Sequence, residues 1–298
     1  MVNRITRFIV VAAPLLFVVM WATGFVVSRL SAPHVDPLTF LAIRFPIAGL
    51  IFAVIAVAAK APWPTGRLAV HAMVAGVLLH AAYLGPIYWA VARGMPAGVS
   101  ALIIGLQPLI TAVMAALMLG ERITIRHWLA LVVGVAGVGL VISPKLSFTV
   151  LGGITPVTTL ACVGGAIAIS LGTVYQKRFA TGLHLASGGA WQYVGATLAA
   201  GAVALLFEDL RFDGTFNAWF ALGWSVIVLS LGAITLLMML IREGQVGRVA
   251  SLIFLVPGVA ALMTFALFDE TLTPLQLLGM AVCAAAVLIV SRSPARPT

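Results

Sequence analysis

Ten apolar stretches, each close to the length of a membrane-crossing helix, constrain this chain more than any motif does. A transmembrane helix needs about 20 consecutive, mostly apolar residues. Of the residues, 62% are hydrophobic and only 8% charged, whereas roughly a quarter of a soluble domain is charged. A soluble globule is therefore excluded, and we predict an all-α membrane protein. The expected spans are 8–30, 38–59, 69–92, 97–119, 127–143, 153–176, 184–207, 217–241, 247–268 and 274–291.

The segments between the spans are short and carry nearly all of the charge. We therefore interpret residues 1–298 as a single transmembrane domain. The first span follows two arginines, as a secretory signal does, but it is longer than a signal's apolar core and has no clear small-residue cleavage site. It is expected to remain a span. Cys162 and Cys283 lie in apolar segments and are interpreted as packing residues rather than as a disulfide or metal pair.

The net charge of +9 is explained by topology rather than by an anionic partner. If the N-terminus is cytoplasmic, twelve basic residues fall in inner segments and four in outer segments. This asymmetry follows the positive-inside rule and places both termini in the cytoplasm. Nucleic-acid binding is not expected. The inner set is Arg4, Arg7, Lys60, Arg67, Arg122, Arg126, Lys177, Arg178, Arg242, Arg248, Arg292 and Arg296; the outer set is Arg29, Arg93, Lys145 and Arg211.

The two halves of the chain repeat one another. Each half holds five spans, an odd number, so residues 153–291 must enter the membrane in the opposite orientation to residues 8–143. Such inverted repeats are typical of secondary transporters that work by alternating access around a site near the midplane. At a shift of 149 positions the matching residues are Leu106, Pro108, Met114, Glu121 and Thr124 with Leu255, Pro257, Met263, Glu270 and Thr273. At a shift of 148 they are Gly24, Arg29, Arg44 and Phe45 with Gly172, Lys177, Gln192 and Tyr193.

These features together resemble a known family. Each half has a proline in its fourth span, Pro108 or Pro257, followed thirteen residues later by Glu121 or Glu270. Ten spans arranged in this way resemble the EamA family of the drug/metabolite transporter superfamily, over roughly residues 8–291 and closest to amino-acid exporters of the YddG type. The resemblance implies a multi-pass protein of the bacterial inner membrane that exports small metabolites, with no catalytic chemistry, metal or bound cofactor.

No carboxylate is expected at mid-membrane, because every aspartate and glutamate falls in a loop or at a span end. Small multidrug transporters of the same superfamily bind cations with a glutamate in the first span, where residues 21–24 here read Trp-Ala-Thr-Gly. A buried cation without a counter-charge is costly, so a proton-coupled exporter of cationic drugs is disfavoured. Glu121 and Glu270 either anchor span ends or contact substrate.

Polar residues inside the spans are candidate substrate contacts. His80 and Tyr83 lie three residues apart and share a helix face. The histidine could bind substrate, titrate as a gate, or hydrogen-bond another helix. Ser100, Gln107 and Thr111, at spacings of seven and four, share a face of the fourth span. The neutral amide of Gln107 suits a zwitterion, although structural bonding between helices explains it equally.

Several further residues complete the candidate site. Ser251 and Phe254 lie in the repeat-related ninth span. Five aromatic residues could form flat apolar walls for a ring-bearing substrate, or pack against lipid and core: Trp21, Tyr175, Trp191, Tyr193 and Trp224. Arg44 could hold a carboxylate, or extend to the headgroups as arginines near span ends do.

Spans five and ten carry small-residue pairs, Ala130 with Gly134 and Gly279 with Cys283. Such pairs permit close contact between helices, which leaves open packing within the chain or a homodimer contact.

The favoured function is the export of a small neutral or zwitterionic metabolite, in particular an amino acid with a large apolar or aromatic side chain, through a central cavity between the repeats. An exporter of another metabolite or drug class is the alternative. An intramembrane enzyme would need paired acids, a metal cluster or a nucleophile with a base at mid-membrane, and a channel would need pore-lining charges or a carbonyl filter. Neither pattern is visible, so the chain is not expected to be an enzyme.

Overall fold

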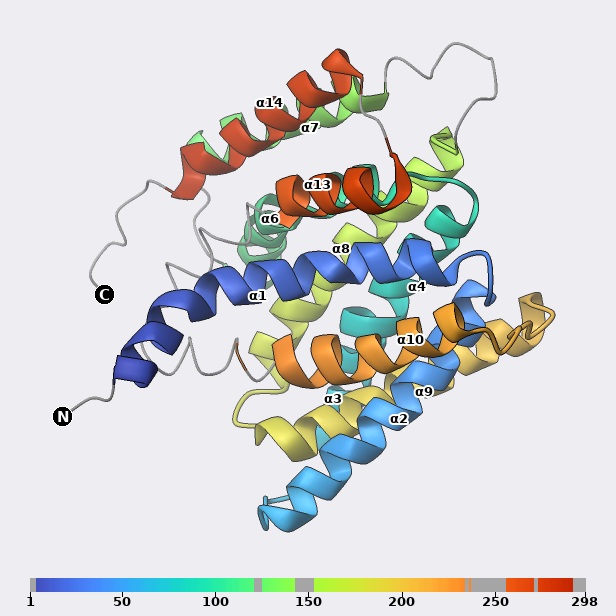
Figure 1. Cartoon of the computed structure of the whole chain (residues 1–298). Coiled ribbons are helices and arrows are strands. Elements are labelled where there is room, and N and C mark those ends of the chain that lie inside the picture. The colour runs from blue at the N-terminus through green and yellow to red at the C-terminus, as the bar shows by residue number, and fades with distance from the viewer. Residues whose placement is uncertain are drawn as a thin grey trace.

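The computed structural model describes residues 4–120, 125–142, 153–233, 236, 256–270 and 273–291, which fold into helices joined by short turns (Figure 1). The helices of the first half are α1 (Arg4–Ser31), α2 (Pro37–Ala58), α3 (Gly66–Gly76), the π-helical segment η1 (Val77–Ala81), α4 (Ala82–Ala92), α5 (Ala97–Ile104), α6 (Gln107–Leu119) and α7 (Ile125–Ile142). Those of the second half are α8 (Pro156–Phe179), α9 (Leu185–Phe207), α10 (Phe216–Trp224), the π-helical segment η3 (Ser225–Ala233), α13 (Val256–Phe268) and α14 (Pro274–Ser291).

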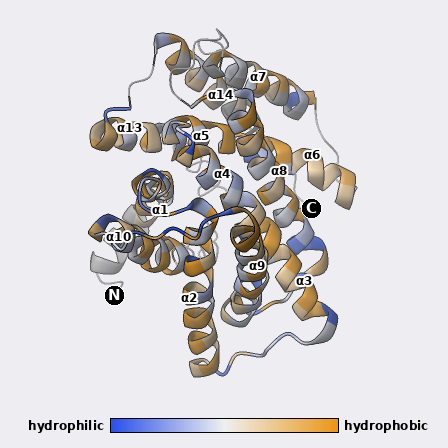
Figure 2. Ribbon diagram, turned by 90° about the vertical axis from the view of Figure 1, so that its right-hand side faces the viewer, coloured by the Kyte–Doolittle hydropathy of each residue, from blue (hydrophilic) through white to orange (hydrophobic). Residues whose placement is uncertain are grey.

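Within the described ranges, six helical stretches are long and apolar enough to cross a membrane. They are Pro37–Ala58, Gly66–Ala92, Ala97–Leu119, Pro156–Phe179, Leu185–Phe207 and Phe216–Ala233. Shorter apolar helices cover Leu15–Ser31, Trp128–Gly137, Val256–Phe268 and Leu277–Ala286. Figure 2 shows hydrophobic residues along the helices and hydrophilic ones gathered on the connecting segments. The protein is thus an all-helical membrane protein, and the count of ten spans stays a prediction.

Helix boundaries recur between the halves. Helices α2 and α9 begin at Pro37 and Leu185, 148 positions apart, and η1 and η3 begin at Val77 and Ser225 with the same shift. Helices α7 and α14 begin and end 149 positions apart. Two of these equivalent pairs also pack together, α2 against α9 and α7 against α14 (Figure 1). The repeated pattern of sequence therefore corresponds to a repeated pattern of helices.

Local signals explain where several helices begin and end. Thr155 and Thr158 form a reciprocal capping box at the start of α8, which satisfies backbone groups that have no partner within the helix. Pro37 occupies the first position of α2, where its missing N–H costs nothing. Gly120 ends α6 with φ +71°, a left-handed conformation that favours glycine.

The turns lie at two opposite ends of the bundle. At one end the segments 32–36 and 208–215 pair with each other, and residues 269–270 contact the start of α5. We call this the paired end. At the other end, which we call the far end, Ser187 near the start of α9 donates a hydrogen bond to Pro62 O at 2.6 Å. Successive helices alternate in direction, so the far end also carries the turn between α8 and α9.

Helices α3 and α9 approach backbone to backbone through two glycines. A Cβ at Gly76 would lie 1.9 Å from Gln192 O, and a Cβ at Gly195 would lie 2.3 Å from Met73 O. Any side chain at either position would force the helices apart. This contact holds α9 close to the first half and places Gln192 and Tyr193 at the centre of the bundle.

The small residues of α7 face the protein's own helices. Ala130 and Gly134 are buried, and a Cβ on Gly134 would meet Leu106, Leu109 and Ala286. This arrangement favours packing within the chain as the role of that pair. A homodimer contact through α7 and α14 stays a prediction.

Candidate functional site

A cavity of about 390 Å³ lies between the two halves. Most of its wall is aliphatic or aromatic with few polar groups, as is typical of small-molecule sites. The first half contributes Trp21, Gly24, Phe25, Arg44, Phe52, Leu79, His80, Tyr83, Leu84, Ile87 and Tyr88. The second half contributes Ile169, Gln176, Leu183, His184, Leu185, Gly188, Gly189, Gln192, Tyr193, Leu229 and Ser230.

Stacked rings form one side of this cavity. The His80 imidazole lies parallel to the Tyr193 ring, with centroids 4.6 Å apart and an interplanar angle of 8°. Phe52 also stacks on Tyr193, at a centroid distance of 5.7 Å. Phe45 lies against His80 and Tyr193 at 6.1 and 5.9 Å. Segments from both halves thus build one aromatic wall, which can hold a flat apolar group.

Arg44 brings a positive charge to the cavity. It lies seven residues into α2 and is only 6% exposed. Its Nη2 donates a hydrogen bond to Ser230 Oγ of η3 at 3.2 Å. Its Nε is buried and has no hydrogen-bond partner among the described residues. The side chain therefore lies inside the bundle rather than at a surface, because α9 and η3 pack over this part of α2.

Both π-helical segments contribute to the cavity. His80 comes from η1, and Leu229 and Ser230 come from η3, which starts 148 positions after η1. A π-helical turn widens a helix locally and is often found at functional sites. The equivalent placement in both halves puts this irregularity on either side of one cavity.

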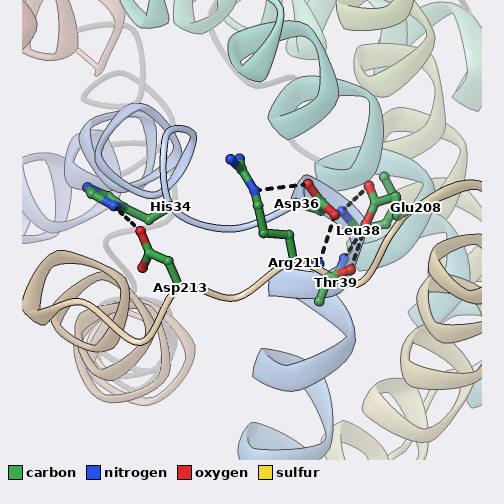
Figure 3. A network of polar contacts seen from close by, with 7 residues as sticks. All are labelled: His34, Asp36, Leu38, Thr39, Glu208, Arg211 and Asp213. Atoms are coloured by element: carbon green, nitrogen blue, oxygen red, sulfur yellow. Dashed lines mark hydrogen bonds and ion pairs between the residues drawn. The ribbon is translucent and has the colours of Figure 1, made fainter.

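A network of polar contacts joins the two halves at the paired end (Figure 3). Glu208, at the end of α9, accepts hydrogen bonds from the backbone N–H groups of Leu38 and Thr39 at 2.8 and 2.7 Å. It also accepts one from Thr39 Oγ1 at 2.8 Å. A carboxylate from the second half therefore caps α2 of the first half, where the helix dipole favours negative charge.

The turns on either side of this cap are also paired (Figure 3). Arg211 donates its backbone N–H to Asp36 Oδ2 at 2.9 Å, and its Nε lies 3.6 Å from Asp36 Oδ1. His34 Nδ1 lies 2.6 Å from Asp213 Oδ2. The pKa of Asp213 is lowered to about 2, chiefly because the Thr215 backbone N–H bonds to it, with a further contribution from His34.

Glu270 makes a second inter-half contact at the same end. Its Oε1 lies 3.3 Å from Arg29 Nε of α1, and its Oε2 accepts the backbone N–H of Ala97 at 3.1 Å. Of the two readings of this glutamate, the structure supports the anchoring role. Its repeat partner, Glu121, lies outside the described residues.

The cavity extends from the middle of the bundle towards the far end. Residues Leu183, His184 and Leu185 of the α8–α9 turn line it, whereas the paired segments 32–36 and 208–215 do not. The cavity therefore does not reach the end of the protein where the paired-end contacts lie.

The family model of the EamA-like transporter family matches residues 8–143 and 157–292. Each half thus fits the same model, and together the matches span most of the chain. The chain belongs to the EamA-like transporter family. The resemblance expected from the sequence is confirmed, and so is the division into two repeats.

Several curated relatives of this EamA-family chain are transporters by name. It is 27% identical to "Uncharacterized transporter YvbV" of Bacillus subtilis (strain 168), over 92% of this chain and 88% of that protein. It is 25% identical to "Probable amino-acid metabolite efflux pump" of Escherichia coli (strain K12), over 89% of each. It is 30% identical to "Probable terminal-alkyne amino-acid exporter" of Streptantibioticus cattleyicolor, over 94% of this chain and 92% of that protein.

The fold is shared with a solved crystal structure. The match covers 93% of this chain and 94% of the solved chain, with a TM-score of 0.62 and 18% sequence identity. At this identity the likeness concerns the fold alone.

Five of the residues considered from the sequence line the cavity of this EamA-family protein: Trp21, Arg44, His80, Tyr83 and Tyr193. Trp21 also packs its ring on Phe17, with centroids 5.4 Å apart. Tyr83 shares a helix with Tyr88, which lines the same wall. Their contact with a substrate stays a prediction.

The polar face expected on the fourth span lies away from the cavity lining. Ser100 is fully buried and donates its hydroxyl to Ala97 O of its own helix. Gln107 accepts a hydrogen bond at its backbone oxygen from Ser170 of α8. Thr111 Oγ1 is buried without a hydrogen-bond partner among the described residues. Gly105 and Leu106 break the span into α5 and α6, so the three side chains do not follow one continuous helix.

The remaining candidates are placed elsewhere. The Tyr175 hydroxyl and His71 Nδ1 are joined by a hydrogen bond of 2.7 Å between α8 and α3. Trp191 lies on α9 with its Nε1 buried, and it is not part of the cavity lining. Ser251 and Phe254 lie outside the described residues.

Sequence reasoning missed Gln192 as a site residue and left Arg44 undecided. The signal was present, because these two polar residues form one of the repeat-related pairs. In an apolar chain, a polar residue at equivalent positions of both repeats indicates the shared interface between them.

Proposed function

We propose that this chain is a secondary transporter that exports amino acids and related zwitterionic metabolites, including aromatic ones, by alternating access. The observation that carries the proposal is the cavity between the repeats, which both halves line and which, among the described residues, reaches the far end and not the paired end. Its volume of about 390 Å³ lies within the range of about 300–1,000 Å³ that is usual for small-molecule pockets.

The relatives' names support the substrate class. Two of them are named for amino-acid efflux or export. The His80–Tyr193 stack supplies a flat surface for a ring-bearing side chain. Arg44 weighs against fully neutral metabolites, since such substrates would leave its buried charge unmatched.

The distribution of basic residues supports the orientation. With both termini in the cytoplasm, the paired end faces outwards and the far end faces the cytoplasm. The cavity is then reached from the side where an exporter collects its substrate. In the other state of the cycle, we propose, the contacts of Glu208 and Glu270 separate and the far end closes. A relative carries "inner membrane transporter" in its name, and we propose a bacterial inner membrane as the location.

The test is transport by the purified full-length protein in liposomes. Liposomes preloaded with unlabelled phenylalanine should accumulate external labelled phenylalanine transiently. This counterflow requires a carrier that alternates between two faces and cannot be produced by a channel. The initial rate should saturate with substrate.

Three results would contradict the proposal. Flux that stays linear with concentration and lacks counterflow indicates a channel, and chemical conversion of the substrate indicates an enzyme. Counterflow supported by quaternary ammonium compounds but not by amino acids indicates a drug exporter. Empty liposomes and liposomes with Gly195→Ala, which disturbs the α3–α9 contact, serve as controls.

A further inference from the structure

We propose that Arg44 binds the carboxylate of the transported substrate, and that a carboxylate is the one charged group that this site requires. The preferred ligands are then aromatic or large apolar monocarboxylates, whether or not they carry an amino group. This inference rests on the proposed function and specifies the substrate class of the same cavity.

The first support is the unused hydrogen-bonding capacity of Arg44. A guanidinium presents five N–H donors in a planar fork that fits both oxygens of a carboxylate. Its Nη2 donates to the neutral Ser230 hydroxyl at 3.2 Å. The Nε donor is buried without a hydrogen-bond partner among the described residues, although the side chain lines the cavity. A ligand carboxylate would accept the hydrogen bond that this Nε donor lacks.

The second support is the absence of a counter-charge in the part of the chain that the structure describes. None of the described aspartates or glutamates lines the cavity. The described carboxylates lie at the paired end, where Glu208, Glu270 and Asp36 bond to backbone or arginine groups. A buried charge needs a partner of opposite sign. Arg44 therefore makes the empty cavity positive and suited to an anionic group.

The third support concerns an amino group on the ligand. Ser230, which bonds to Arg44, and Tyr88 and Gln192, which line the same cavity, are neutral. They can accept a hydrogen bond from an ammonium group but cannot balance its charge. An ammonium near Arg44 would also be repelled by the guanidinium. Removing the amino group from a bound amino acid is thus expected to cost little affinity, whereas removing the carboxylate costs much.

The aromatic wall gives the site its second requirement. Arg44 and Phe45 are adjacent on α2, and Phe45 lies 5.9 Å from Tyr193 between ring centroids. A ligand with its carboxylate at Arg44 has the His80–Tyr193 stack available for its ring or branched chain. The site thus combines one anionic contact with one flat apolar surface.

The experiment compares four ligands that share one ring and differ in charge. Binding of 3-phenylpropionate, L-phenylalanine, 3-phenylpropanamide and phenethylamine to the purified full-length protein is measured by isothermal titration calorimetry. We expect 3-phenylpropionate to bind at least as tightly as phenylalanine. The amide and the amine should bind at least tenfold more weakly. An amide or amine that binds as tightly as the acid overturns the proposal, and this comparison requires no variant.

Variants then assign the preference to one side chain. Arg44→Gln should remove the preference for the acid over the amide, and Arg44→Lys should retain part of it because it keeps the charge but not the fork. Arg93→Gln is the matched control, since Arg93 lies outside the cavity with its guanidinium 3.8 Å above the Trp89 ring. A preference for the acid that survives in folded Arg44→Gln overturns the proposal. If that variant does not fold, Ser230→Ala tests the same contact. An unchanged ratio of the affinities for the acid and the amide then counts against the proposal.

The outcomes separate this inference from the proposed function. Saturable counterflow of phenylalanine without any preference for acids overturns only the proposal that Arg44 binds a carboxylate. Absence of saturable flux for all four compounds overturns both this proposal and the proposed function.

Discussion

Arg44 and Gln192 occupy equivalent positions in the two repeats, 148 residues apart, and both line the same cavity. The repeat therefore contributes a cation from α2 and a neutral amide from α9 to the same site. An exactly symmetric pair of arginines would leave two buried charges to balance. The divergence of this one pair leaves a single cation at these two positions, which gives a ligand with one charged end a preferred orientation.

Trp21 and Trp191 form a matched pair for testing the cavity wall. Trp21 lines the cavity and Trp191 does not. We expect Trp21→Ala to weaken binding of aromatic ligands by about 0.5–1.5 kcal/mol, the usual value of a ring-to-ring contact. Trp191→Ala should lower the thermal unfolding temperature while leaving affinity unchanged. Calorimetric titration with phenylalanine and melting curves check both. Equal losses of affinity would mean that the cavity is not the binding site.

Glu208 is expected to hold the paired end closed. Glu208→Gln keeps the shape but removes the negative charge that caps α2. Charge-assisted hydrogen bonds contribute about 1.5–3 kcal/mol each, so a loss of about 1.4 kcal/mol would raise the population of the open state roughly tenfold. The readout is the labelling rate of Leu84→Cys, in the cavity wall, by a membrane-impermeant maleimide added outside.

The labelling experiment has a neighbouring control. Asp209→Asn removes the next, exposed carboxylate and should leave the labelling rate as it is. If Glu208→Gln labels no faster than Asp209→Asn, then the contacts of Glu208 do not control access.

Gly195 and Gly201 lie on the same helix and differ in what surrounds them. A Cβ at Gly195 would meet Met73 O at 2.3 Å, whereas nothing lies within 4 Å of a Cβ at Gly201. Gly195→Ala should therefore destabilise the protein by about 1–3 kcal/mol through overpacking, and Gly201→Ala should be neutral or slightly stabilising. Thermal unfolding in detergent measures both. A neutral Gly195→Ala would show that α3 and α9 are not held in backbone contact.

Asp213 should make stability depend on pH only in strong acid. Its pKa is about 2, below the ordinary 3.8, because the Thr215 N–H and His34 favour its charged form. A carboxyl group with a lowered pKa contributes stability that is fully present above its unfolded value and is lost as the pH falls through its folded value. The melting temperature of the wild type should fall towards that of Asp213→Asn between about pH 4 and pH 2. A difference that is constant over this range would exclude the contribution of Asp213.

The spans and the repeat could be predicted because both depend only on the order of residues along the chain. A run of apolar residues indicates a membrane-crossing helix regardless of which helices pack against it. A fixed shift such as that from Pro108 to Pro257 can be recognised without knowing how the helices pack. The shift even extends to the π-helical segments, whose starting residues Val77 and Ser225 carry no sequence signal of their own.

The cavity lining could be predicted only in part. In helices that are apolar on every side, hydropathy does not say which face points to the centre, so the sequence points to Gln107 and Thr111 and gives no reason to select Gln192. The burial of Arg44 depends on α9 and η3, which lie far away in the sequence. Whether an arginine near a span end reaches the headgroups or turns inwards is decided by these neighbours.

The unmatched charge of Arg44 also ties the carrier to the membrane voltage. With a monocarboxylate that lacks an amino group bound, the site is neutral, and after release it is positive, whereas a bound zwitterionic amino acid leaves the site positive. A unit charge that crosses the whole field gains about 2.3 kcal/mol per 100 mV, so an inside-negative potential draws the empty site towards the cytoplasm and leaves the site loaded with such a monocarboxylate nearly unaffected. We expect a potassium diffusion potential in liposomes to speed the return of empty wild-type carriers and not of Arg44→Gln. The cell's electrical potential would then reset the exporter after each turnover, without a proton.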